Sequence, residues 1–160
     1  MASNETSHRI RPVEAGNVAD LIRIGEETNL SPWTAQHYLD EIKDPNAIML
    51  RVVAEDNSTL GFVVGRRVTG GSIDTTLDAE IYNIAVNKER QGSGFGQELF
   101  DAFANLCRQS GVGNIWLEVR ESNKQAIGFY KRNGFEQVQT RNNFYSDPRE
   151  HALLMRLILK

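Results

Sequence analysis

The sequence predicts one α/β (α+β) domain in which helices flank a single central sheet. Segments rich in β-branched and aromatic residues alternate along the chain with segments whose apolar residues recur at helical spacing. Such interleaving is typical of α/β and α+β domains. The length of 160 residues suits one domain, and no repeat, low-complexity tract or linker divides the chain. We expect residues 9–160 to form this domain and residues 1–8 to be a disordered or flexible N-terminal segment.

The first half of the chain predicts an edge strand, two helices and a hairpin. Residues 9–13 alternate in polarity like a short edge strand, and Asn17 offers an N-cap for the first helix. The run Ser31-Pro32-Trp33-Thr34 predicts a second helix start, because Ser or Thr can cap a helix and Pro suits its first turn. Residues 48–54 and 61–68 predict a hairpin around the turn residues Asp56-Asn57-Ser58, followed by a turn at Gly70-Gly71-Ser72.

The second half predicts four more strands and two helices. Residues 79–86 read as a central strand, and a glycine loop then opens a long helix that stops at Ser110-Gly111. Its apolar face carries Phe95, Leu99, Phe103, Leu106 and Cys107. Residues 115–119 predict a short buried strand, and Ser122 with Gln125 predicts a capping box for a helix that ends at Gly134. Two strands near residues 135–140 and 152–159 complete the sheet.

Composition narrows the classes of function. The chain has 18 Lys and Arg against 21 Asp and Glu, and the net charge of −3 argues against direct nucleic-acid binding. No apolar run reaches the roughly 18–20 residues of a membrane span, and residues 1–6 lack a signal-peptide pattern, so we expect a cytoplasmic protein without membrane contact. Cys107 is the one cysteine, which excludes an internal disulfide. The histidines show no ligand spacing, so we expect no metal; they are His8, His37 and His151.

The most informative stretch is the glycine loop at residues 90–97, between a predicted strand and a predicted helix. Glycines at a helix start let backbone N–H groups approach a phosphate, and the helix dipole adds positive potential there. A Walker A loop is excluded because Gln97-Glu98 follows the last glycine, and the dinucleotide fingerprint lacks its third glycine. The alternatives are therefore an anion site of another type or a flexible connector.

The loop Gln91-Gly92-Ser93-Gly94-Phe95-Gly96 resembles the acyl-CoA pyrophosphate loop of the GNAT superfamily of N-acetyltransferases. Ser122-Asn123 and the run Tyr130-Lys131-Arg132-Asn133-Gly134-Phe135 extend the resemblance, which covers residues 9–158. It implies the GNAT fold, with a mixed, mostly antiparallel sheet, and acetyl-CoA as cosubstrate. It also implies a set of cofactor-binding residues, which is Ile84, Ala85, Val86, Gln91, Gly92, Ser93, Gly94, Phe95, Gly96, Gln97, Asn123 and Tyr130.

Within the superfamily the chain is most similar to the bacterial ribosomal-protein-alanine N-acetyltransferases of the RimI type. Four segments carry this similarity: residues 31–34, 79–86, 117–123 and 141–155. The chain departs from that type at Phe144, where a Tyr is common, and at His151, where an acidic residue is frequent. Both departures fall in the expected peptide-binding loop.

The resemblance implies Glu118 as general base and Tyr130 as general acid. An amine must lose a proton to attack a thioester, and the departing thiolate benefits from a donor. An α-ammonium has a pKa of about 8 against about 10.4 for lysine, so neutralising it at pH 7 costs roughly 1.4 instead of roughly 4.6 kcal/mol. From the residues alone, composition favours Glu118 as a solvated side chain paired with Arg120 or Arg141, and Tyr130 is also consistent with a core aromatic.

These expectations combine into an enzyme that acetylates the N-terminal alanine of a small-subunit ribosomal protein. Trp33 and Tyr145 are the expected substrate-binding residues, although Trp33 also suits a hydrophobic anchor between the early helices. The alternatives are an acetyltransferase acting on a small-molecule amine and a catalytically silent acyl-CoA-binding sensor module. The sequence does not define the oligomeric state.

Overall fold

The computed structural model describes residues 9–28, 30, 33–69 and 77–159. Our expectations for residues 1–8, for Ser31 and Pro32, and for the turn at Gly70-Gly71-Ser72 lie outside the described residues. In the described part, no helix is both long and apolar enough to cross a membrane.

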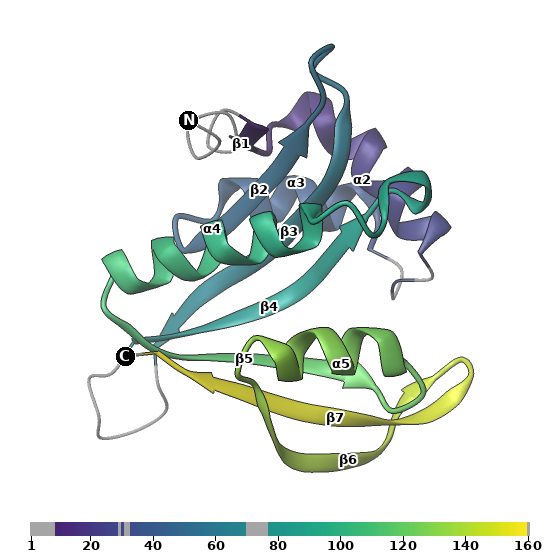
Figure 1. The fold of residues 1–160 in the computed structure, drawn as a ribbon, viewed down its shortest axis with the longest axis vertical. Helices are drawn as coiled ribbons and strands as arrows, with labels where there is room; N and C mark the ends of the chain where they lie inside the picture. The colour runs from purple at the N-terminus through teal and green to yellow at the C-terminus, as the bar shows by residue number, and fades with distance from the viewer. Residues whose placement is uncertain (1–8, 29, 31–32, 70–76, 160) are drawn as a thin grey trace.

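The described strands form one seven-stranded sheet of order β1-β2-β3-β4-β5-β7-β6 (Figure 1). The strands are β1 Ile10–Pro12, β2 Ala47–Val53, β3 Thr59–Thr69, β4 Leu77–Val86, β5 Val112–Arg120, β6 Glu136–Ser146 and β7 Arg149–Ile158. All neighbouring pairs are antiparallel except β4 with β5. The expected mixed, mostly antiparallel sheet is confirmed, and so is the edge position of β1.

Helices cover both faces of this sheet (Figure 1). On one face lie α4 (Phe95–Gln109) and α5 (Lys124–Arg132), and on the other lie α2 (Val18–Glu27) and α3 (Ala35–Lys43). Short 3-10 turns precede α2 (Ala15–Asn17) and α4 (Lys88–Arg90). Each face has its own core, one built around the fully buried Phe103 of α4 and the other around Leu21 of α2. The apolar stripes therefore place the helices, since burial of a large side chain contributes about 1.5–3 kcal/mol.

The helix ends confirm two expectations and correct a third. Thr34 caps α3 by accepting a hydrogen bond from the N–H of His37 at 3.2 Å. Gly111 follows α4 with a positive φ of 80°, as a helix stop requires. The capping box at Ser122 is wrong, because α5 begins one residue later and Asn123 accepts from the N–H of Ala126. The N–H of Ser122 instead donates to Glu150 on β7, a contact that no local pattern predicts.

A bulge in β4 creates the feature that positions the site. The β3–β4 register shifts between Val64 and Gly65, so Val64 faces Asn83 and Gly65 faces Ile81, which leaves Tyr82 as the extra residue. Bulges bend a strand and increase its twist. The parallel pairing of β4 with β5 ends at Ile81, and beyond it the two strands diverge (Figure 1).

The bulge also exchanges the two faces of β4. Before it, Ile81 packs in the core beneath α4; after it, Ala85 packs in the core beneath α2 and α3, while Ile84 and Val86 lie against the α4 core. The plain alternation of the sequence would have put Ile81 and Ala85 on the same face. The bulge thus places Asn83 and Ala85 on the α3 side, the face on which Tyr82 also lies.

Candidate active site

The divergence of β4 and β5 leaves backbone available for a ligand. Residues Ile84, Ala85 and Val86 pair with β3 on one edge, and no described strand pairs with their other edge. Main-chain amides along a free strand edge can bind an extended, amide-containing ligand as an added strand does. Residues 84–86 therefore present a free strand edge, and their pairing with pantetheine stays a prediction.

The glycine loop continues from this edge to the start of α4. Gly92 and Gly94 have φ of 84° and 86°, a left-handed conformation that favours glycine, and Gly94 is the N-cap of α4. Within the described residues, the backbone N–H groups of residues 92–97 donate to no backbone acceptor. Gln91 ties the loop to β4, because its side-chain amide donates to the Val86 carbonyl at 3.2 Å. Free N–H groups at a helix N-terminus suit a pyrophosphate.

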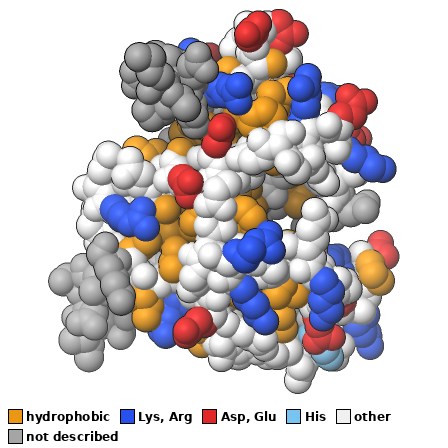
Figure 2. Space-filling model, viewed as in Figure 1, with side chains coloured by type: hydrophobic (Ala, Val, Ile, Leu, Met, Phe, Trp, Pro, Cys, Tyr) orange, Lys and Arg blue, Asp and Glu red, His pale blue; other side chains and the backbone are white. Residues whose placement is uncertain are grey.

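The surface around this loop supports the same interpretation. In the space-filling view the molecule is hollowed between the end of β4 and α5, with Lys and Arg side chains on both sides (Figure 2). The exposed basic residues of these elements are Lys88, Arg90, Lys124, Lys131 and Arg132. Their charge complements an anionic cofactor.

Polar side chains also connect the two helices beside the glycine loop, α4 and α5. The side-chain amides of Gln97 and Asn133 exchange hydrogen bonds of 2.7 and 3.2 Å, which join the start of α4 to the end of α5. Asn123 uses its oxygen to cap α5. A contact of Asn123 with the cofactor stays a prediction.

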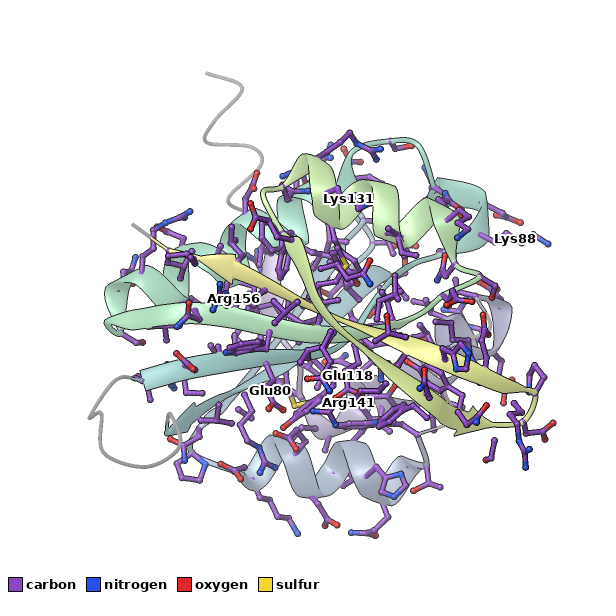
Figure 3. The ribbon with its side chains drawn as sticks, turned by 90° about the horizontal axis from the view of Figure 1, so that it is seen from below. Glu80, Lys88, Glu118, Lys131, Arg141 and Arg156 are labelled. Carbon is purple, nitrogen blue, oxygen red and sulfur yellow. The ribbon has the colours of Figure 1, made fainter. Side chains whose placement is uncertain are left out.

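A cavity of about 630 Å³ lies on the α3 side of the sheet, where β4 and β5 part. It contains three predicted site residues, which are Trp33, Glu118 and Tyr145. Residues that our prediction did not assign to the site also line it, namely Asp78, Glu80, Tyr82, Asn83, Trp116 and Arg141. Figure 3 shows Glu80, Glu118 and Arg141 gathered on this face of the sheet, while Lys131 lies on α5 across it. The alternate spacing of Asp78 and Glu80 on one strand could have indicated a shared face.

Glu118 is half-buried in this cavity and only partly paired. Its Oε1 atom lies 3.5 Å from a guanidinium nitrogen of Arg141, and its Oε2 atom is buried without a hydrogen-bond partner in the described part of the chain. Burial raises the pKa of the Glu118 carboxyl, the charge of Arg141 opposes this rise, and Glu80 adds to it. Of the two arginines that the sequence offered, Arg141 is therefore the one that pairs with Glu118. The Oε2 atom of Glu118 stays free to accept a proton.

Tyr130 approaches from the opposite side of the sheet. It is 7% exposed and packs with Phe129 and Phe135 in the α4 core. Burial raises the pKa of its phenol well above the usual value, and the neighbouring Tyr145 raises it further. The hydroxyl is thus protonated at neutral pH, as a proton donor must be. It takes part in no hydrogen bond among the described residues.

Trp33 and Tyr145 form aromatic walls of the cavity. Trp33 packs against Tyr38 and Tyr82 with ring centroids 5.1 and 5.7 Å apart, so it is both an anchor for α3 and part of the cavity. Tyr145 lies under the guanidinium of Arg120, 4.1 Å from its ring centroid.

Cys107 does not line the cavity. It is fully buried in the α4 core, and burial raises the pKa of its thiol to about 11. The thiolate form is therefore scarce at neutral pH. Within the residues that the structure describes, no group of three metal-binding side chains is present.

Divergent parallel strands beside a glycine-rich helix start, with a cavity on the reverse face, define an acyl-CoA-dependent acyltransferase. Residues 18–135 match the model of the acetyltransferase (GNAT) family. The chain therefore belongs to the GNAT family of acetyltransferases and is an acetyl-CoA-dependent N-acetyltransferase.

Individual relatives agree with this assignment. The chain is 33% identical over 150 residues to the [ribosomal protein bS18]-alanine N-acetyltransferase of Haemophilus influenzae, covering 91% of this chain and 95% of the relative. It superposes on the ribosomal-protein-S18-alanine N-acetyltransferase of Escherichia coli with a TM-score of 0.81, 25% identity, and coverage of 94% and 93%. Ard1 from Thermoplasma volcanium gives a TM-score of 0.83, 29% identity, and coverage of 94% and 97%.

Proposed function

We propose that this enzyme transfers acetyl from acetyl-CoA directly to the N-terminal α-amine of a protein, the alanine of a small-subunit ribosomal protein in the cytoplasm. The relatives named for ribosomal protein S18 support this choice of acceptor. The observation that carries the proposal is the free, buried oxygen of Glu118 in a cavity at the divergence of β4 and β5.

The cosubstrate would lie along the free edge of β4 and end at the glycine loop. The backbone of Ile84, Ala85 and Val86 would pair with the pantetheine arm, and the N–H groups of residues 92–97 would hold the pyrophosphate. An acetyl-CoA-bound neighbour of the same fold, NAA60 from Arabidopsis thaliana, supports this choice of ligand at the level of the fold. Bound acetyl-CoA supplies the activated thioester.

The acceptor would enter from the α3 side, between Trp33 and Tyr145. Glu118 takes the proton that the α-ammonium must lose, directly or through a water molecule, and the neutral amine attacks the thioester carbon. The C–S bond then breaks, the Tyr130 hydroxyl gives its proton to the leaving thiolate, and the second proton that the nitrogen loses as it becomes an amide returns to the phenolate through solvent. A backbone N–H near Val86 would polarise the thioester carbonyl. Because the thiol of Cys107 is buried elsewhere, the transfer is direct.

The test is an acetyl-CoA assay with a ribosomal peptide that begins with Ala, the same peptide with a blocked N-terminus, and a panel of small amines. We expect transfer to the free peptide alone. Transfer to the blocked peptide would contradict the choice of the α-amine, and activity confined to the small amines would favour a small-molecule enzyme.

Glu118→Gln keeps the shape of the side chain and removes the base. We expect kcat to fall about 10²-fold while the affinity for acetyl-CoA is unchanged. Glu121→Gln is the matched control, because Glu121 is exposed just beyond the end of β5 and outside the cavity. Equal turnover of the wild-type enzyme and Glu118→Gln would remove Glu118 from the mechanism.

A further inference from the structure

The cavity contains a second carboxylate, that of Glu80, whose surroundings differ from those of Glu118. Asp78 accepts from the Asn114 amide and the Trp116 indole, both at 3.1 Å, and Glu118 pairs with Arg141. Glu80 forms no ion pair within the described residues. Of these three carboxylates, Glu80 therefore has neither an ion pair nor an N–H donor among the described residues, and its near polar neighbour is the Tyr82 hydroxyl on the same strand.

The sheet register explains why Glu80 has no cationic partner. Arg66 lies directly opposite Glu80 on β3, where opposite charges normally pair. The Arg66 guanidinium is instead turned toward α3, where it contacts Glu41 at 2.6 Å and Asp44 at 3.2 Å. Glu41 is 5% exposed, so this pair is held firmly.

On the β5 side of Glu80, the cation nearest in the sheet register also has another partner. Trp116 of β5 lies opposite Glu80, and Arg156 of β7 lies opposite Trp116. The Arg156 guanidinium lies 5.5 Å from the centroid of the Trp116 ring. The two nearest cations in the register, Arg66 and Arg156, are thus both bound elsewhere, and Glu80 faces the cavity (Figure 3).

A second, independent observation indicates a ligand in the same cavity. The side chain of Asn83 is 6% exposed and lines the cavity, and its buried amide nitrogen completes no well-formed hydrogen bond in the described residues, although the Tyr38 phenol lies close to it. A buried donor without an acceptor is costly unless a ligand supplies one. A peptide carbonyl is an acceptor of the required kind.

The walls beside Glu80 favour a cation. Tyr82, Trp116 and Trp33 line the cavity with aromatic rings, which attract ammonium and guanidinium groups. A carboxylate among such rings is suited to an Arg or Lys side chain. Glu80 and Glu118 are also close enough for the charge of Glu80 to act on Glu118.

From these contacts we infer that Glu80 is a specificity residue, which selects acceptor proteins that carry Arg or Lys at one of the two positions after the acetylated residue. The inference rests on the proposed function, because it takes the α-amine to lie at Glu118. Asn83 would donate to a carbonyl of the same peptide. The Arg or Lys side chain of the acceptor would then pair with Glu80, as Arg66 does not because it pairs with Glu41 and Asp44.

The experiment uses peptides that begin with Ala and differ only at positions two and three, as Arg-Gly, Gly-Arg, Gln-Gly and Glu-Gly. For the wild-type enzyme we expect kcat/KM at least tenfold higher for the better Arg peptide than for the Gln peptide, and lowest for the Glu peptide. Glu80→Gln should remove this preference for the Arg peptides. Its kcat/KM for the Gln peptide should stay within about threefold of the wild-type value. Glu80→Arg should reverse it in favour of the Glu peptide.

The matched control is Glu55→Gln, because Glu55 is exposed near the β2–β3 turn and does not line the cavity. Thermal melting and CoA affinity report whether the Glu80 variants are folded, and the wild-type peptide series tests the inference without any variant. Equal kcat/KM for all four peptides would overturn the role of Glu80 and leave the proposed function intact. Activity on small amines with none on any peptide would overturn the proposed function itself.

Discussion

The Arg141 guanidinium lies 3.5 Å from the Oε1 atom of Glu118 and leaves the Oε2 atom of that carboxylate without a hydrogen-bond partner in the described chain. Arg141 comes from β6 and Glu118 from β5, and β7 lies between these two strands in the sheet. Arg141 therefore acts on Glu118 from two strands away, as a charge that favours the ionised carboxylate.

Arg141→Gln should move the acid limb of the kcat/KM profile to higher pH. Burial raises the pKa of Glu118 and Arg141 lowers it, so removing the cation raises the pKa further. Activity that depends on the carboxylate is then lost at a higher pH as the medium is acidified. The measurement is the pH dependence of kcat/KM with one peptide for both enzymes. Superimposable profiles would show that Arg141 does not control the base.

Tyr130→Phe should lower kcat about 10²-fold and leave folding stability within about 0.5 kcal/mol of the wild-type value. The hydroxyl makes no hydrogen bond in the described residues, so its loss breaks no contact, while the ring keeps its packing on Phe135. Stopped turnover together with an unchanged melting temperature would support a proton donor. Unchanged turnover in Tyr130→Phe would mean that Tyr130 is a core residue only.

Gly94→Glu should weaken CoA binding at least tenfold, through bulk and repulsion beside the pyrophosphate. Gly111→Glu is a matched control, because Gly111 has a similar φ of 80° and, like Gly94, open space where a Cβ would lie. Both substitutions carry a similar backbone cost of about 1 kcal/mol. Calorimetric titration with CoA measures the affinity of both variants and so separates a loss of pyrophosphate binding from backbone strain. A similar loss of affinity in both variants would attribute it to backbone strain and argue against the loop assignment.

Cys107→Ala should leave kcat unchanged and lower the free energy of unfolding by about 1 kcal/mol, since it removes a buried sulfur from the α4 core. Direct transfer needs no cysteine, whereas an acetyl-enzyme would. Steady-state kinetics and chemical denaturation give the two values. A large fall in kcat in a folded variant would point to a covalent intermediate.

Local patterns predicted most of the elements because their signals lie within a few residues. The apolar stripe of α4, the Thr34 cap and the left-handed glycines are each recognisable in a short window. The cap of α5 was misplaced by one residue because Glu150, far along the chain, binds the N–H of Ser122. Strand β6 runs to Ser146, beyond the predicted residue 140, because pairing with β7 stabilises a polar stretch that lacks a strand pattern.

By itself the sequence predicted the glycine loop and the helix that follows it. The glycine loop and the helix after it are contiguous, and their backbone geometry follows from glycine alone. Only the tertiary structure decided the lining of the cavity, because a bulge at Tyr82 exchanges the faces of β4 and four separate strands bring Glu80, Glu118, Leu154 and Arg141 together there. Strand register and the pairing of Arg66 with α3 are long-range outcomes, and no short stretch of residues encodes which carboxylate stays unpaired.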